Sequence, residues 1–264
     1  MNDATTDPTL SVERIGVQCR ITIQRIEKHN ALSRETLAEL ASTVEATAQD
    51  ESVNYLVIVG AGTRYFAAGG DLVDLANIRS TEDTAKFAAS SRAALDAIRG
   101  CALPVIACLN GDALGGGAEL ALACDMRVMA TTARIGYVQA RLAITSAWGG
   151  GPDLCALVGP ARALRMMSRA EMIGSAEALA WGLCEAVFDG GLDGEAAQAF
   201  FAPLAATPRH VLAALKANVV ACRPPSTYQA ARQVEHDNLV ATWTHPAHWT
   251  AVEHVLARPR SRKH

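Results

Sequence analysis

The chain has 264 residues, half of them hydrophobic and only 5% aromatic, which suffices for one large domain with an aliphatic core. Its formal net charge of -3, from 24 basic and 27 acidic residues, provides no basic field to attract nucleic acid. The sequence has no apolar run of the roughly eighteen residues that a membrane span needs, and its polar start lacks the features of a signal peptide, so we expect a soluble, cytoplasmic protein.

Strand and helix patterns alternate in the N-terminal part of the chain. The β-branched alternation over 12–23 predicts two strands joined by a turn near Gly16. Ser33 is a candidate N-cap for a helix that runs to about Asp50, and the apolar run 55–59 predicts a buried strand. This order of elements is typical of an α/β fold.

The same alternation continues and then gives way to helices. A helical pattern over 81–99 stops at Gly100, and the apolar segments 104–109 and 125–129 predict two more strands. Further helices are predicted near residues 151–158, 161–168 and 175–181, and the end of the chain is helical throughout. We therefore expect an α/β core over 1–200 and a helical segment over 201–264.

Two loops rich in glycine and alanine follow predicted buried strands. They are the segments 66–72, Phe-Ala-Ala-Gly-Gly-Asp-Leu, and 110–120, which contains the triplet Gly115-Gly116-Gly117. Small residues let a ligand approach the backbone, and the triplet also opens a helix, whose first N–H groups lack internal partners. Two such N–H groups converging on one oxygen would form an oxyanion hole, although turns and close packing alone also use such glycines.

Glu119 is the only charged residue between Ala113 and Cys124, amid Ala, Leu and Gly. Burial without a partner would raise the pKa of this carboxyl group, which suits a general acid or base. The alternative, equally open from the pattern, is a structural carboxylate paired with Arg127 or Arg141.

Other chemical motifs are missing or incomplete. The segment Gly60-Ala61-Gly62 begins like a dinucleotide fingerprint, but the third glycine is replaced by Tyr65, so an NAD-linked oxidoreductase is a distant alternative. The seven scattered cysteines form no C-x-x-C pair and are typical of free thiols in a reducing compartment. The pair His245 and His248 has no carboxylate or thiol nearby in sequence, so we expect no metal site.

Taken in order along nearly the whole chain, these motifs resemble the crotonase (enoyl-CoA hydratase/isomerase) superfamily. The similarity rests on Asn30-Ala31-Leu32, on the two glycine-containing loops with Glu119, on Cys124-Asp125 and on 175–183. It implies a spiral of ββα units whose C-terminal helices build a homotrimer or a dimer of trimers. It also implies an acyl-CoA substrate, with coenzyme A as part of that substrate and no separate cofactor, and a place in fatty acid metabolism.

The resemblance assigns roles to individual residues. The N–H groups of Gly70 and Gly116 would hold the thioester carbonyl, and Glu119 would be the acid or base. Lys28, and Arg258 from a neighbouring subunit, are candidates for the CoA phosphates, and the adenine would lie near 67–68. Together, the residues expected to contact the substrate are Lys28, Ala31, Ala67, Ala68, Gly69, Asp71, Leu72, Gly115 and Trp148.

Gln139 is the main departure from the family pattern. Family hydratases have a second glutamate near this position, and an amide cannot act as a general base. Gln139 can still orient a water molecule or a substrate carboxylate, and Glu119 alone would then serve both proton transfers.

Three functions therefore stay open, and a hydratase- or isomerase-like lyase is the first. The Gly-Gly-Gly-Ala-Glu-Leu segment and Trp148-Gly149-Gly150 are similar to the ethylmalonyl-CoA decarboxylase branch, which favours a decarboxylase of malonyl-type CoA esters as the second. A non-catalytic acyl-CoA binder is the third, and no nucleic-acid or membrane partner is expected.

Overall fold

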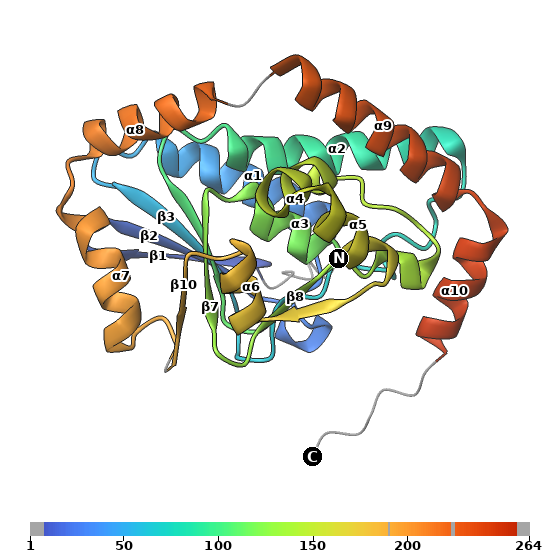
Figure 1. The fold of residues 1–264 in the computed structure, drawn as a ribbon, viewed down its shortest axis with the longest axis horizontal. Helices are drawn as coiled ribbons and strands as arrows, with labels where there is room; N and C mark the ends of the chain where they lie inside the picture. Colours follow the sequence, from blue (N-terminus) through green and yellow to red (C-terminus); the bar gives the residue numbers. More distant parts are fainter. Residues whose placement is uncertain (1–7, 190, 223–224, 258–264) are drawn as a thin grey trace, which may run out of the picture.

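Two β-sheets lie side by side in the computed structural model, which describes residues 8–189, 191–222 and 225–257 (Figure 1). The larger sheet has six strands in the order β1-β2-β3-β5-β7-β10, and the smaller has the order β4-β6-β8-β9. Pairs β1–β2 and β8–β9 are antiparallel, and the other pairs are parallel. The strands are β1 Leu10–Ile15, β2 Gln18–Ile23, β3 Tyr55–Gly60, β4 Tyr65–Ala67, β5 Val105–Leu109, β6 Asp112–Leu114, β7 Met126–Ala130, β8 Arg134–Gly136, β9 Met172–Gly174 and β10 Ala186–Phe188.

The chain visits the two sheets in turn, and this alternation produces the spiral. Strands β3 and β4 are followed by α2, strands β5 and β6 by α3, and strands β7 and β8 by η2 and α4. Each of these three turns thus adds one strand to each sheet, and helical segments follow each pair of strands. The predicted α/β spiral of ββα units is confirmed.

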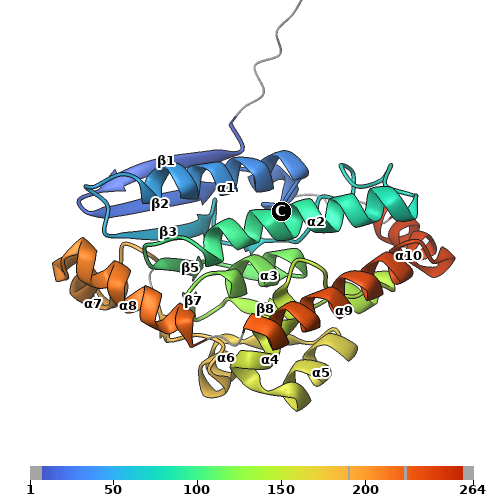
Figure 2. The ribbon, with the colours of Figure 1, turned by 90° about the horizontal axis from the view of Figure 1, so that it is seen from above.

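Helices cover both sheets (Figure 2). The predicted N-cap at Ser33 is confirmed, because its hydroxyl accepts a hydrogen bond from the Thr36 N–H at 3.2 Å. The helices are η1 Ile26–Lys28, α1 Arg34–Ala48, α2 Thr81–Arg99, α3 Gly116–Ala123, η2 Gln139–Leu142, α4 Gly150–Val158, α5 Pro160–Ser168, α6 Ser175–Trp181, α7 Glu195–Ala206, α8 Arg209–Ala221, α9 Pro225–Trp243 and α10 Pro246–Leu256.

The central strands β3 and β5 are buried along their whole length, as expected for parallel strands covered on both faces. One face packs on α1, α2 and α3, and the other forms a smaller cluster with α7, in which Tyr55 stacks on Phe201. Helix α7 runs through residue 200, so the boundary expected there falls inside a helix.

The last helices return to the core. Helix α9 lies alongside α2 in both ribbon views and also packs on α4, and α10 packs on η2 (Figures 1 and 2). This return places the C-terminal segment beside the two glycine-containing loops.

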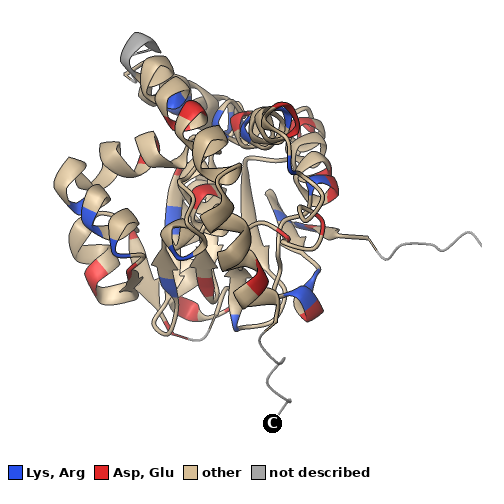
Figure 3. Ribbon diagram, turned by 90° about the vertical axis from the view of Figure 1, so that its right-hand side faces the viewer, with Lys and Arg blue, Asp and Glu red and all other residues tan. Residues whose placement is uncertain are grey.

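Charge is mixed over the surface that the described elements present. In the side view, acidic and basic residues are interspersed along the ribbon (Figure 3). None of the helices in the described ranges has the length and apolarity needed to cross a bilayer.

Removing the cap of α1 tests the account of this fold. We expect Ser33→Ala to lower the free energy of unfolding by about 1 kcal/mol, because the first turn of α1 loses a hydrogen-bond acceptor. Urea unfolding measures the change. Ser42→Ala, on the exposed face of the same helix, is the control. An equal loss in both variants would contradict the capping role.

Candidate active site

The two glycine-containing loops meet beside the smaller sheet. Gly69 and Gly115 have positive φ angles of 97° and 52°, which favour glycine. A Cβ atom on Gly69 would lie 2.9 Å from the Leu114 carbonyl oxygen and 3.5 Å from the Gly116 nitrogen. The loops therefore touch through their backbones, as the paired motifs predicted.

Two N–H groups at this contact stay available. Within the described ranges, no hydrogen bond uses the N–H of Gly70 or that of Gly116, the first residue of α3. The start of α3 favours negative charge at the Gly116 N–H, and a second free donor at Gly70 beside it suits an oxygen that gains charge during a reaction.

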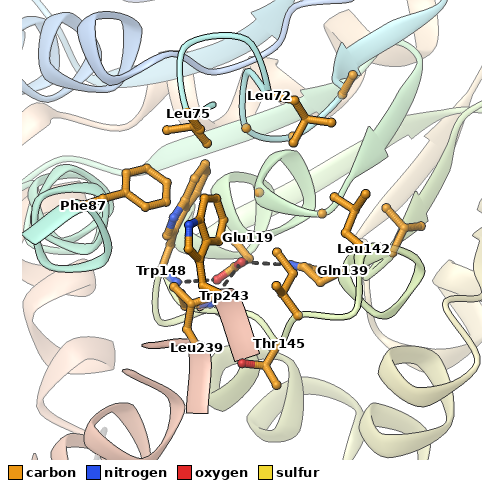
Figure 4. Close-up of a pocket in the computed structure, with 18 residues that line it drawn as sticks. Leu72, Leu75, Phe87, Glu119, Gln139, Leu142, Thr145, Trp148, Leu239 and Trp243 are labelled. Atoms are coloured by element: carbon orange, nitrogen blue, oxygen red, sulfur yellow. Dashed lines mark hydrogen bonds between the residues drawn. The ribbon is translucent and has the colours of Figure 1, made fainter. Parts of the chain in front are cut away.

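A cavity of about 130 Å³ opens in front of these groups (Figure 4). Its walls are mostly apolar, and its polar side chains are Glu119, Gln139 and Thr145. Nine residues predicted for the site line it: Ala68, Gly69, Gly70, Leu72, Gly115, Gly116, Glu119, Gln139 and Trp148.

Glu119, on α3, is the carboxyl group of this cavity and is only 2% exposed. Its Oε2 accepts the N–H of Trp148 at 2.7 Å and that of Gly150 at 3.1 Å. Its Oε1 accepts the Gln139 side-chain amide at 2.9 Å and the Ala147 N–H at 3.4 Å. The three backbone donors belong to the loop that leads into α4 and to Gly150, the first residue of α4. The N-terminus of α4 thus stabilises the buried carboxylate.

The pKa of Glu119 is raised above the ordinary value of a glutamate. Burial is the largest cause, and the nearby carboxylate of Glu235 is the second. The N–H groups of Trp148, Gly150 and Ala147 oppose this effect. A carboxyl group in this state can both accept and release a proton near neutral pH.

The alternative in which Glu119 pairs with an arginine is wrong. Arg127 binds Glu185 at 2.8 Å, and Arg141 donates to the Ala170 carbonyl at 2.6 Å. Backbone N–H groups and one amide hold Glu119 instead.

Gln139 lies on η2, and its side chain is directly hydrogen-bonded to Glu119 at the edge of the cavity (Figure 4). Its Nε2 donates to Glu119, whereas its Oε1 is buried and has no hydrogen-bond partner within the described part of the chain. A buried amide oxygen without a donor is costly, so Gln139 offers an acceptor to a bound water or substrate.

Trp148 forms one wall of the cavity. Its indole ring packs so closely on α3 that a Cβ atom on Gly116 would lie 2.3 Å from Cζ3. Phe87 meets the ring edge-on, with centroids 6.2 Å apart, and also contacts Trp243 of α9. These rings restrict the space available beyond the two N–H groups.

Four predicted substrate contacts lie outside the cavity walls: Lys28, Ala31, Ala67 and Asp71. Although burial opposes ionisation of Asp71, hydrogen bonds from Arg25 and the Asp74 and Val73 N–H groups lower its pKa. Asp71 thus fixes the turn that follows the first loop. Lys28 is half-exposed, with Nζ 3.8 Å from Asp71, and Arg258 lies outside the described residues.

Several cavity residues were not found from the sequence. They come from distant segments with ordinary apolar patterns, so nothing local marks them: Leu75, Phe87, Val138, Leu142, Ile144, Thr145, Ala147, Leu239 and Trp243.

The described residues contain no group of His, Cys, Asp or Glu side chains arranged to hold a metal ion. His248 is buried, with Nδ1 2.8 Å from the Leu142 carbonyl oxygen.

A methyl group on Gly116 should disturb the Trp148 wall. We expect Gly116→Ala to lower the free energy of unfolding by about 1–3 kcal/mol, because the ring or α3 must shift. Gly174→Ala is the control, since a Cβ atom there meets nothing within 4 Å. Urea unfolding and tryptophan fluorescence report both variants. A Gly116→Ala protein as stable as the control would show that the wall is not tightly packed.

Similar proteins place this site in a family. Crotonyl-CoA hydratase of Syntrophomonas wolfei is 38% identical over 165 residues, which are 62% of this chain and 63% of that protein. Ethylmalonyl-CoA decarboxylase of Gallus gallus is 31% identical over 248 residues, which are 92% of this chain and 82% of that protein. The chain thus spans less than two thirds of the length of the hydratase, whereas it spans 82% of the length of the decarboxylase.

Solved structures share the fold. An enoyl-CoA hydratase/isomerase from Xanthobacter autotrophicus has a TM-score of 0.85 at 24% identity, covering 94% of this chain and 93% of that one. An enoyl-CoA hydratase from Bacillus anthracis has a TM-score of 0.77 at 28% identity, covering 89% and 92%. The family model for enoyl-CoA hydratase/isomerase matches residues 15–252, so the chain belongs to this family, as its motifs predicted.

Proposed function

We propose that the protein is an acyl-CoA lyase that acts through a thioester enolate, with hydration of a short enoyl-CoA as its first candidate reaction. The observation that carries the proposal is a buried acid/base carboxyl, Glu119, in the same small cavity as the free N–H groups of Gly70 and Gly116. In this proposal the thioester oxygen accepts both N–H groups, and they stabilise the negative charge that develops on it.

Hydration by this site uses one glutamate. The Glu119 carboxylate takes a proton from a water molecule, whose oxygen attacks Cβ, and the electron pair of the double bond moves to the thioester as an enolate. The same carboxyl group then returns the proton to Cα. The free Oε1 of Gln139 accepts the second proton of that water as a hydrogen bond and orients it.

Decarboxylation of a malonyl-type CoA ester is the second candidate. Gln139 stands where family hydratases have a second glutamate, and the decarboxylase relative matches 92% of this chain. Loss of CO₂ leaves the same enolate in the same oxyanion hole, and one proton donor suffices to complete the reaction. Protonated Glu119 would be that donor.

The cavity favours a short acyl group. Its volume of about 130 Å³ is slightly smaller than the ~150 Å³ apolar cavity that holds a benzene molecule. Roughly six non-hydrogen atoms therefore fit, which suits a crotonyl group of four carbons and one oxygen better than an ethylmalonyl group of five carbons and three oxygens.

Coenzyme A would extend from the mouth of the cavity. Ala68 lines the cavity, and the backbone near Ala67 is the expected contact for adenine. Ala31 and Asp71 fix the adjoining turn through Arg25, whose guanidinium donates to both residues. The half-exposed Lys28 is free to turn toward a phosphate.

We further propose a homotrimer or dimer of trimers, a cytoplasmic location and a role in fatty acid metabolism. Support for assembly comes from apolar side chains that α8 leaves exposed, namely Val211, Leu215, Val219 and Val220.

Mass-resolved turnover of crotonyl-CoA and ethylmalonyl-CoA tests the two candidates. We expect wild type to add one water to the first or to release CO₂ from the second, and Glu119→Gln to lose at least about 100-fold in kcat. Hydration should accelerate as pH rises through the raised pKa of Glu119, because the carboxylate is the base. Decarboxylation should slow over the same range, because the acid form is the donor. Binding without any turnover would leave a non-catalytic acyl-CoA binder.

Exchanging the amide for a carboxylate separates the candidates further. If the reaction is hydration, Gln139→Glu should raise kcat, because a second carboxylate shares the proton transfers. If it is decarboxylation, the same variant should be slower, since a carboxylate there repels the substrate carboxylate. Gln139→Ala removes the amide without adding charge and is the control. Identical rates in all three proteins would show that this position does not act on the substrate.

A further inference from the structure

The start of α4 is held by two buried carboxylates, one on each side. Glu119 accepts the N–H groups of Trp148 and Gly150. Glu235, on α9, accepts those of Gly149 at 2.9 Å and Gly151 at 2.7 Å, and the Ser146 hydroxyl at 2.6 Å. The N–H groups thus alternate between the two glutamates along one short segment.

Glu235 is behind this segment, away from the acyl cavity. It is 8% exposed and lines a second cavity of about 770 Å³ between α4 and α9, whereas it does not line the first. A substrate bound at Gly70 and Gly116 therefore cannot touch Glu235. Glu235 can thus affect the reaction only indirectly, through the α4 segment, through its own helix or through its charge.

The same helix also closes the acyl cavity. Leu239 and Trp243 follow Glu235 at intervals of four residues and line the cavity, so the three side chains share one face of α9. The Trp243 indole N–H donates to the Ile78 carbonyl at 2.9 Å. Arg99 anchors the arrangement from α2, because it binds Asp153 of α4 at 2.8 Å and the Trp148 carbonyl at 3.1 Å.

We propose that Glu235 is a positioning residue for Glu119: it holds the α4 segment so that the Trp148 and Gly150 N–H groups point at Glu119, and it links them to the helix that closes the cavity. The inference deepens the proposed function and rests on it for its effect on turnover. Its structural part, the control of the Glu119 carboxyl, does not depend on which reaction occurs.

The charge of Glu235 also affects the pKa of Glu119. Burial is the largest cause of the raised pKa of both carboxyl groups, and for Glu119 the charge of Glu235 adds to it. Charged and titratable groups of the adjoining elements surround this pair: Arg99 of α2, Tyr137 after β8, Asp153 and Cys155 of α4, and Tyr228 and Arg232 of α9. Asp125 and Arg127 line the same cavity as Glu235. Of these, Arg99 stabilises the ionised form of Glu235.

Glu235→Gln tests the inference, because it removes the charge and turns one acceptor into a donor that faces an N–H group. We expect kcat to fall about tenfold with KM changed less than about twofold, because the Trp148 and Gly150 N–H groups lose their alignment. The pH dependence of kcat should move to lower pH by roughly one unit, because loss of the neighbouring charge lowers the pKa of Glu119 by more than the weakened N–H contacts raise it. A ¹³C NMR titration of the Glu119 carboxyl, assigned by its loss in Glu119→Gln, should move in the same direction. Glu235→Asp keeps the charge and should restore the titration to near its wild-type position.

Asp237→Asn is the matched control, since it removes a carboxylate from the exposed face of the same helix. We expect it to leave kcat and the titration unchanged. An unmoved Glu119 titration in Glu235→Gln, or an equal shift in Asp237→Asn, would overturn the inference. If wild type turns over no acyl-CoA, the proposed function fails, while the titration still decides the role of Glu235.

Discussion

The start of α3 packs directly on the backbone of β4, and the positions of the proposed reacting groups depend on that contact. A Cβ atom on Gly117 would lie 2.1 Å from the Ala67 carbonyl oxygen, so no other residue lets the helix approach this closely. The approach brings the N–H of Gly116 beside the loop that carries Gly70. It also fixes Glu119, one helical turn further along α3, at the side of the same cavity. Close backbone packing thus creates both the oxyanion hole and the acid/base group of the proposed mechanism.

The second constraint is the buried negative charge. Ionised carboxylates are costly to bury, and backbone N–H groups at the start of α4 partly offset that cost for Glu119 and Glu235. Burial, and for Glu119 also the charge of Glu235, outweighs these N–H groups, so the pKa of each carboxyl group stays high. An arginine partner would have held Glu119 ionised, with little tendency to accept a proton. The absence of a nearby cation in the described part of this cavity therefore suits acid/base chemistry.

The sequence predicted the parts that are marked by local patterns. The long strands, the capped helix after Ser33, the two glycine loops and Glu119 were found because periodicity, capping and small residues signal them. The strands β4, β6, β8, β9 and β10 have only three residues each, too few for a visible alternation. Glu235 and Trp243 were missed because α9 carries charged and apolar residues on all its faces, and only tertiary packing shows which of them turn inward.

The central claim is that this cavity stabilises a thioester enolate and that Glu119 moves the proton. Exchange of the Cα protons of butyryl-CoA with D₂O measures this step directly, because a saturated acyl group can be neither hydrated nor decarboxylated. We expect exchange by the wild-type protein, detected by NMR, and its loss in Glu119→Gln with butyryl-CoA still bound. Tight binding of butyryl-CoA without exchange, or undiminished exchange in Glu119→Gln, would contradict it.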